Sequence, residues 1–274
     1  MTETTLKSIV FPTDFSDEGF DAFAHALRIG VANRSLLHLL HIGAGDEQHN
    51  WTLFPHVRKT LTRWGMLGEG ASETDVATKL GVRVRKAHVK AHNPVEGIVS
   101  YLGINECDLL VLETHARTDL QRLLHGSVSE EAARLTRAPT LFLREGQRGF
   151  VNPETGATRL GLVLIPIDDN ISPMPAWRWL SQFGAPFNSP CQFRLMHVGE
   201  ATPKIDDALP PVELLRGPVV DTIVSYAREI DADLIAMPTS GRHGLFDAVQ
   251  GSTTERVIRT ADQPVLAIPN QRLS

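Results

Sequence analysis

The sequence predicts an α/β protein of two repeated, doubly wound domains, each with a mostly parallel five-stranded sheet, the second copy being the shorter. This prediction comes from a repeat. The chain reads CDLLVLETHAR over residues 107–117 and ADLIAMPTSGR over residues 232–242, and a Gly-Ser pair follows each at the same interval, at 126–127 and 251–252. A strand, a loop of small residues and a helix start that recur in this order indicate two copies of one unit.

The spacing between matching residues shows where the two copies differ. His41 matches His197, 156 residues later, whereas Asp108 matches Asp233 at a spacing of 125 residues. The second copy has therefore lost about 31 residues (156 minus 125) from its middle. In the first copy the extra segment lies within residues 43–92, and its loss would open a flank of the second copy or leave a surface that the first copy covers.

The individual elements are predicted from the pattern of apolar residues. Short apolar runs are typical of buried parallel strands. They occur at Ser8–Phe11, Leu36–Ile42, Val82–His88, Leu109–Leu112, Thr140–Leu143, Gly161–Ile167, Phe193–Val198, Val212–Leu215, Leu234–Met237 and Val265–Ile268. Helices are predicted between them at Asp17–Val31, Trp51–Trp64, Val95–Gly103, Val128–Thr136, Pro175–Phe183, Val219–Ile230 and Thr253–Thr260. This alternation predicts right-handed crossovers and a parallel sheet in each copy.

The copies are expected to form one domain at residues 1–145 and another at residues 159–274. Residues 146–158 are polar and contain glycine, which is typical of a linker. Ser16 and Ser172 each stand just before a predicted helix, where a serine side chain is expected to cap the first turn.

The composition describes a soluble globular protein and limits its partners. The 274 residues are 42% hydrophobic and 22% charged, which is enough apolar material for two buried cores. A net charge of −5 argues against nucleic acid or an anionic membrane as the main partner. No secretory signal and no membrane-spanning stretch is found, so a cytoplasmic location is expected. Cys107 and Cys191 show no CxxC spacing and predict neither a disulfide framework nor a zinc site.

Three features of each copy are expected to meet at one edge of its sheet, because ligands of open parallel sheets bind beyond the carboxyl ends of the strands. They are an aspartate after the first strand (Asp14 or Asp168), a histidine at the end of the second, and the Gly-Ser pair. The Gly-Ser pair would present backbone N–H groups at a helix N-terminus, which attracts phosphate. The aspartates would suit a ribose hydroxyl or an adenine amino group.

Each of these features also has a purely structural interpretation. Ser127 and Ser252 both stand three residues before a glutamate, which is the spacing of a capping box. The two aspartates can serve as turn residues that lead into a helix. His41 and His197 can simply pack at the strand ends. The sequence alone leaves both interpretations open.

No enzymatic or metal-binding signature is found. The chain has no GxxxxGK[ST], no GxGxxG after its first strand and no GxSxG. The histidines of the first copy show no zinc-like spacing beside a carboxylate, so no metal site is predicted. No residue is predicted to be catalytic.

Several motifs together resemble the universal stress protein family. The segment Pro12–Ser16 (PTDFS), the pair His41-Ile42 and the stretch Asp108–Ser127 are similar to that family's motifs in the same order, and the second copy repeats them. The resemblance covers nearly the whole chain, so the protein is identified as a tandem, two-domain member. It implies the family's five-stranded parallel α/β fold of the HUP type, which is commonly dimeric, and in some members it implies ATP binding.

The ATP-binding members carry the pattern G-x2-G-x9-G-[ST], together with the strand-end aspartate and a hydrophobic residue after the strand-two histidine. By this resemblance the second copy would bind nucleotide through Asp168, Val198, Gly241, Gly251, Ser252 and Thr253. Pro238 stands where the first glycine belongs and removes one N–H donor. The matching residues of the first copy are Asp14, Ile42, Glu113, Ala116, Gly126 and Ser127. This site is expected to be degenerate, because Glu113 would bring negative charge toward phosphate and Ala116 would strain any positive φ.

The resemblance thus implies a stress-response protein that binds ATP or a related adenine nucleotide, with or without Mg²⁺, in its second copy. The alternative is a scaffold or adaptor that binds no nucleotide and acts through protein contacts. A weak ATPase is a third alternative, although the sequence supplies no dedicated base or Mg²⁺ ligands. Because an apolar final strand such as Val265–Ile268 needs a partner, the copies are expected to form an intramolecular pseudo-dimer through these strands, and a homodimer is a further alternative.

Overall fold

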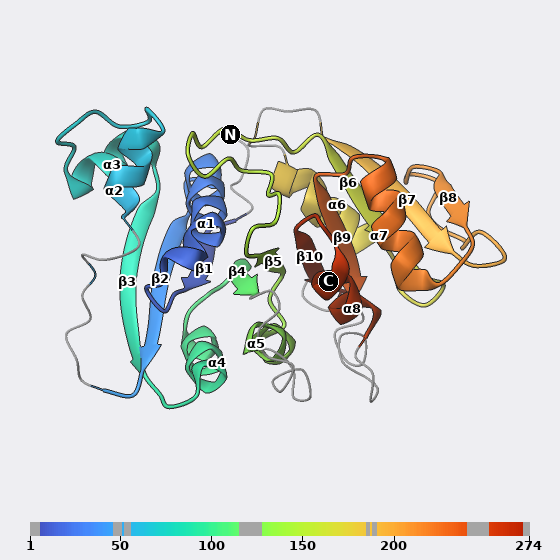
Figure 1. Ribbon diagram of the computed structural model, residues 1–274, viewed down its shortest axis with the longest axis horizontal. Coiled ribbons are helices and arrows are strands. Elements are labelled where there is room, and N and C mark those ends of the chain that lie inside the picture. Colours follow the sequence, from blue (N-terminus) through green and yellow to red (C-terminus); the bar gives the residue numbers. More distant parts are fainter. Residues whose placement is uncertain are drawn as a thin grey trace. The chain divides into compact units, whose positions relative to one another are not determined.

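The computed structural model describes residues 6–45, 51, 56–114, 128–184, 187, 191–239 and 252–270. The chain forms two compact units (Figure 1). Unit 1 contains Met1–Thr136 and Leu143–Thr158, and unit 2 contains Arg137–Phe142 and Arg159–Ser274. Both units alternate strands and helices around parallel strands, which is the predicted α/β class.

Unit 1 has the parallel strand order β3-β2-β1-β4. Its strands are β1 (Ser8–Pro12), β2 (Leu36–Gly43), β3 (Arg83–Lys90) and β4 (Leu109–Thr114). The next strand in the sequence, β5 (Thr140–Arg144), is divided after Phe142, and its first part belongs to unit 2. Its helices are η1 (Asp17–Gly19), α1 (Phe20–Asn33), α2 (Val57–Arg63), α3 (Glu73–Leu80), α4 (Pro94–Ile104) and α5 (Val128–Thr136).

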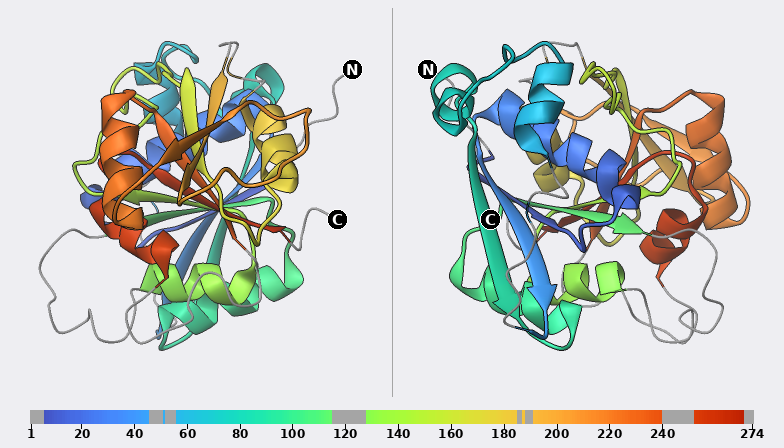
Figure 2. Two further views of the ribbon diagram at one scale, coloured as in Figure 1. Left: turned by 90° about the vertical axis from the view of Figure 1, so that its right-hand side faces the viewer. Right: turned by 60° about the vertical axis from the view of Figure 1, so that its left-hand side comes forward.

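Helices α1 and α4 cover opposite faces of the unit 1 sheet, as the right-hand view of Figure 2 also shows. Gly30 of α1 lies against Leu37 of β2, whereas Gly97 of α4 lies against Ile42 of the same strand. Because side chains alternate along a strand, residues 37 and 42 point to opposite faces. This is the doubly wound arrangement that the strand–helix alternation predicted.

Unit 2 has the parallel order β10-β9-β6-β7-β8. Its strands are β6 (Leu162–Pro166), β7 (Gln192–Val198), β8 (Val212–Leu215), β9 (Leu234–Thr239) and β10 (Val265–Pro269). Its helices are α6 (Met174–Gly184), α7 (Val219–Glu229) and α8 (Thr253–Thr260), with α6 on one side of the strands and α7 and α8 on the other in the left view of Figure 2. Residues Thr140–Phe142 of β5 pair antiparallel with β10, so this final strand has partners along both sides.

Two aspartates that match in the repeat hold the same position in the two units. Asp108 accepts hydrogen bonds from the backbone N–H groups of Lys7 and Ser8, at 2.8 and 2.9 Å, where β1 begins. Asp233 accepts from Gly161 and Leu162, at 2.8 and 3.0 Å, where β6 begins. The repeated aspartate therefore ties the start of the first strand of each unit to the loop that precedes β4 or β9.

The extra segment of the first copy contains two helices. A helix was predicted over Trp51–Trp64, and the structure has α2 from Val57 to Arg63. Residues 52–55 lie outside the described part of the chain. Helix α3 was not predicted. It is short and mostly polar, and it starts with a capping box in which Ser72 and Asp75 exchange hydrogen bonds.

The segment predicted to be a linker packs against unit 1. Val151 donates its N–H to Nε2 of His25 on α1, at 3.0 Å. Pro153 accepts from Nε1 of Trp64, at 2.9 Å, just after α2. Gly156, with φ of +68°, lies so close to the Trp64 ring that an added Cβ would come within 2.5 Å of it. We call residues 146–158 the connector.

The two predicted helix caps differ in outcome. Ser172 accepts from the N–H of Met174, the first residue of α6, at 3.4 Å, as predicted. Ser16 is the N-cap residue of η1, as predicted, with Asp17 and Glu18 in the first turn, but its side chain makes no capping hydrogen bond. The carboxylate of Asp14 accepts the Ser16 N–H at 2.9 Å, so an aspartate turn organises this helix start instead.

Candidate functional site

The candidate nucleotide site of unit 2 lies at the carboxyl ends of β6, β7 and β9. Asp168 follows β6 and is exposed. Its Oδ1 accepts the backbone N–H groups of Asn170 and Ile171, at 2.7 and 2.9 Å, so the turn interpretation of this residue is confirmed. Its second oxygen, Oδ2, accepts no hydrogen bond from any residue that the structure describes, which leaves it available to a ligand hydroxyl or amino group.

The histidine at the end of the second strand has a structural role in both units. Nδ1 of His197 donates to the carbonyl oxygen of Ile167 at 3.0 Å, and Nδ1 of His41 donates to that of Thr13 at 2.9 Å. Each imidazole thereby ties the end of one strand to the residue that follows its neighbour. Val198, the predicted hydrophobic residue after the strand-two histidine, is the last residue of β7.

Helix α8 begins at Thr253, as predicted, and Ser252 forms its capping box. Ser252 Oγ accepts the N–H of Glu255 at 3.2 Å, and the Glu255 carboxylate accepts the N–H of Ser252 at 2.7 Å. The capping interpretation of Ser252 is thus confirmed, and its own N–H group is already bonded. The N–H groups of Thr253 and Thr254 donate to no acceptor among the described residues, as expected in a first helical turn.

The end of β9 carries a buried hydroxyl that no motif predicted. Thr239 is 1% exposed, and within the described part of the chain its Oγ1 has no hydrogen-bond partner. A buried hydroxyl without a partner costs free energy, so such a group is a natural contact for a polar ligand. The preceding Pro238 is paired in the sheet opposite Ile268 of β10. Gly241 and Gly251 of the predicted site lie outside the described residues.

The matching edge of unit 1, at the carboxyl ends of its strands, differs from the candidate site of unit 2 in its charged residues. Asp14 forms the turn described above, and Ile42 packs against α4. Glu113, the next-to-last residue of β4, is half-buried. Burial, followed by the negative charges of Asp14, Glu145, Asp21 and Glu18, raises the pKa of Glu113 to about 7. The remaining predicted residues of this site, Ala116, Gly126 and Ser127, lie outside the described part.

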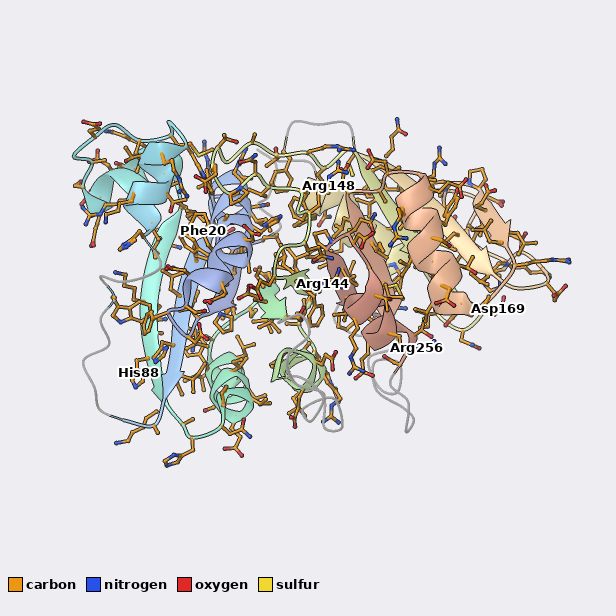
Figure 3. The ribbon with its side chains drawn as sticks, viewed as in Figure 1. Phe20, His88, Arg144, Arg148, Asp169 and Arg256 are labelled. Carbon is orange, nitrogen blue, oxygen red and sulfur yellow. The ribbon has the colours of Figure 1, made fainter. Side chains whose placement is uncertain are left out.

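An aromatic cluster at the same edge of unit 1 was not predicted from the sequence. Phe15, whose φ is +69°, stacks on His41 with ring centroids 4.3 Å apart, and His41 in turn stacks on His88 of β3 at 5.6 Å. A bulky residue rarely adopts this left-handed conformation. The second copy has Asp169 in place of Phe15, and Figure 3 labels both His88 and Asp169. The register of β2 with β3 puts His41 opposite His88, a pairing that the sequence does not show.

A second constellation in unit 1 has the residue types of a catalytic site but not its geometry. Ser8 Oγ donates to the carbonyl oxygen of Glu106 at 2.6 Å and accepts from Nε2 of His38 at 3.2 Å. Nδ1 of His38 accepts from the hydroxyl of Tyr101 at 2.6 Å. Ser8 and His38 are buried, and the Ser8 proton is committed to a carbonyl, so this network stabilises the core rather than activating a nucleophile.

In the part of the chain that the structure describes, no group of three or more His, Cys, Asp or Glu side chains is arranged to hold a metal ion. Among the helices that the structure describes, none has both the length and the apolar character needed to cross a membrane.

Comparison with known proteins places this fold and these motifs in one family. The model of the universal stress protein family matches residues 5–144 and 200–269. A universal stress protein of Methanocaldococcus jannaschii is 45% identical over 153 residues, which cover 53% of this chain and 86% of the relative.

Solved structures agree on the fold. A universal stress protein from Archaeoglobus fulgidus matches with a TM-score of 0.59 at 17% identity, covering 97% of this chain and 96% of that one. A functionally unknown protein from Pseudomonas aeruginosa matches with a TM-score of 0.62 at 16% identity, covering 99% and 95% of the two chains. The chain belongs to the universal stress protein family.

Proposed function

We propose that the protein is a cytoplasmic stress-response protein that binds ATP or a related adenine nucleotide in unit 2. The observation that carries the proposal is the N-terminus of α8, where the N–H groups of Thr253 and Thr254 remain without an acceptor among the described residues. Such a helix start offers donors and a positive partial charge to phosphate. The buried Thr239 hydroxyl supplies a further polar group at the end of the neighbouring strand β9.

The remaining groups of unit 2 suit the other parts of a nucleotide. Oδ2 of Asp168 can accept a ribose hydroxyl or an adenine amino hydrogen while Oδ1 keeps the turn in place. Val198 at the end of β7 offers an apolar contact for the base. Pro238 has no N–H to give, so we expect weaker binding than the full glycine pattern would allow.

Unit 1 is the poorer candidate because of its charge. Glu113 occupies the position where the family's ATP-binding pattern has its first glycine, and it lies in a field of other carboxylates. At an effective dielectric constant of about 20, two like charges about 4 Å apart repel by roughly 4 kcal/mol. A triphosphate at this edge would meet that repulsion directly.

Calorimetric titration of the full-length protein with ATP, ADP and AMP, with and without Mg²⁺, tests the proposal. We expect binding that Gly251→Asp abolishes and that the matched change in the first copy, Gly126→Asp, leaves intact. Equal loss from both variants would contradict a site confined to unit 2. Phosphate release measured in the same samples would show whether the protein is also a weak ATPase.

A scaffold or adaptor function is the alternative, and the Ser252 capping box favours it. Both the N–H and the hydroxyl of Ser252 already have partners within the helix, so the box is complete without a ligand. The absence of binding at millimolar nucleotide would support this alternative over nucleotide binding.

A further inference from the structure

The strands of unit 2 reverse their order between β6 and β9. The chain places β7 and β8 on one side of β6 and then returns to place β9 and β10 on the other side. In open parallel sheets, ligands bind outside the carboxyl ends of the strands at such a reversal. Asp168 follows β6 and Thr239 ends β9, so one of these residues stands on each side of the reversal.

A hydrogen bond passes across the end of β9 at this point. Asn270, the residue after β10, donates from Nδ2 to the carbonyl oxygen of Ser172 at 3.1 Å, and Ser172 belongs to the segment between β6 and α6. Because β9 lies between β10 and β6 in the sheet, this bond connects the strand ends on either side of Thr239. Thr239 is itself paired opposite Pro269, the residue before Asn270. Asn270, Thr239 and the turn of Asp168 therefore meet at one end of the sheet.

Each of these three residues has an oxygen atom without a partner in the part of the chain that the structure describes. The Thr239 hydroxyl is buried and unpaired. Oδ1 of Asn270 is shielded from solvent and also unpaired. Because the carbonyl of Ser172 can only accept, the atom that faces it is the amide nitrogen of Asn270, which fixes Oδ1 as the unpaired atom. Oδ2 of Asp168 is the third, since both hydrogen bonds of its turn end on Oδ1.

These three oxygen atoms select the chemistry of a ligand. The carboxylate of Asp168 and the carbonyl of Asn270 only accept hydrogen bonds, whereas the Thr239 hydroxyl both donates and accepts. Phosphate oxygens are negatively charged acceptors, so they suit the N–H groups at the start of α8 rather than these oxygens. An adenine amino group only donates and would leave the Thr239 proton without an acceptor. Two neighbouring sugar hydroxyls can donate to the two acceptors and still accept from Thr239.

We propose that Asn270 is a specificity-determining residue of unit 2, which acts with Asp168 and Thr239 to bind the ribose diol of the nucleotide. This inference rests on the proposed function and adds the end of β10 to the site. It also orients the ligand, with its sugar toward the ends of β6, β9 and β10 and its phosphates toward α8. The pattern G-x2-G-x9-G-[ST] ends at Ser252, so it does not include Asn270.

Calorimetric titration of the full-length protein with ATP and with 2′,3′-dideoxy-ATP tests the assignment, because the second ligand lacks only the two hydroxyls. A site built to bind hydroxyl groups rejects a ligand without them, so we expect the wild type to bind ATP at least about tenfold more tightly. Equal affinity for the two ligands would overturn this inference and leave the proposed function intact. The absence of binding to either ligand would overturn both.

Two substitutions identify the protein groups that read the sugar. Asn270→Leu removes an acceptor at nearly constant shape, and Thr239→Val replaces the hydroxyl with a methyl group. Each should weaken ATP binding and leave dideoxy-ATP binding unchanged, so that the preference falls to within about threefold. Equal weakening of both ligands would contradict the assignment. Thr239→Val breaks no hydrogen bond among the described residues of the free protein, so it decides the matter even if Asn270→Leu, which loses the Ser172 contact, does not fold.

The matched control is Asn105→Leu in unit 1. Asn105 also donates from Nδ2 to a backbone carbonyl oxygen, that of Tyr101, at 2.9 Å. Its replacement should leave the preference for ATP over dideoxy-ATP as in the wild type. If Asn105→Leu lost the preference as Asn270→Leu does, the effect would belong to lowered stability and the inference would fail.

Discussion

The imidazole of His25 accepts the backbone N–H of Val151 at 3.0 Å and so fastens the connector to helix α1. Its other nitrogen, Nδ1, donates to the carbonyl oxygen of Asp21 at 2.7 Å. The ring is buried, and this burial lowers the pKa of His25 to about 4. His25 is therefore neutral near pH 7, with both nitrogens in use.

Removing this imidazole should destabilise unit 1. In His25→Ala the Val151 N–H loses its acceptor and a cavity is left under the connector, so we expect the free energy of unfolding to fall by about 2 to 4 kcal/mol. Chemical denaturation measures this change. The control is His92→Ala at an exposed position, for which a change within about 0.5 kcal/mol is expected. Similar losses in the two variants would contradict the role assigned to His25.

The pH dependence of stability should also change when His25 is replaced. Because its folded pKa lies below the ordinary value of 6.5, the unfolded chain takes up this proton first, and stability is lost as pH falls from 6.5 toward 4. The difference in stability between the wild type and His25→Gln, measured by thermal unfolding at each pH, should therefore shrink or reverse below pH 6. A difference that stays constant from pH 7 to 4 would show that His25 does not titrate this way.

The repeated aspartates, Asp108 and Asp233, offer a test in which each unit serves as the control for the other. Asp108→Ala leaves the N–H groups of Lys7 and Ser8 without their acceptor, and Asp233→Ala does the same to Gly161 and Leu162. Each change should cost about 1 to 3 kcal/mol. Hydrogen exchange resolved by segment should show the loss of protection only in the unit that carries the substitution. Loss in both units from one change would contradict the separate roles.

Replacement by alanine is expected to have opposite effects on stability at two glycines, Gly199 and Gly103. Gly199 follows β7, and a Cβ there would come within 2.3 Å of the His197 ring, so Gly199→Ala should destabilise unit 2 by about 1 to 3 kcal/mol. Gly103 lies in α4 with no atom within 4 Å of an added Cβ. Gly103→Ala should therefore stabilise the protein by about 0.5 to 1 kcal/mol. Melting temperatures of the two variants should move in opposite directions.

The capping serines separate stability from binding. Ser252→Ala and Ser72→Ala each remove a capping hydroxyl and should each cost about 1 kcal/mol. Only Ser252→Ala, at the proposed phosphate end of α8, should also weaken nucleotide binding in calorimetry. Weaker binding in Ser72→Ala would point to a general effect of lowered stability.

Most elements could be predicted because their signals are local. Apolar runs marked all ten strands in the part of the chain that the structure describes, and the limits of α5, α8 and β8 agree with the prediction. Helix α3 escaped because it is short and largely polar. The sequence also could not show that residues 146–158 pack closely, because a polar stretch with glycine is typical of both a free linker and a docked one.

The site was predictable to the extent that it rests on strand ends. Asp168 and Val198 could be placed because each adjoins an apolar run that a pattern identifies. The unpaired Thr239 hydroxyl and the stack of Phe15 on His41 could not, because both depend on contacts between residues far apart in the sequence. The raised pKa of Glu113 belongs to the same class, since it needs Asp14 and Glu145 as neighbours.

The assignment of residues 137–142 to unit 2 has a practical consequence for anyone who wishes to study one copy alone. The chain passes from one unit to the other after residues 136, 142 and 158, so no single cut releases either of them whole. A fragment that starts at Arg159 would lack Thr140–Phe142, the segment paired with β10, and would present a bare, apolar strand to its neighbours in solution. Such a truncated product is expected to aggregate, and its aggregation would not reflect the solubility of the full-length protein.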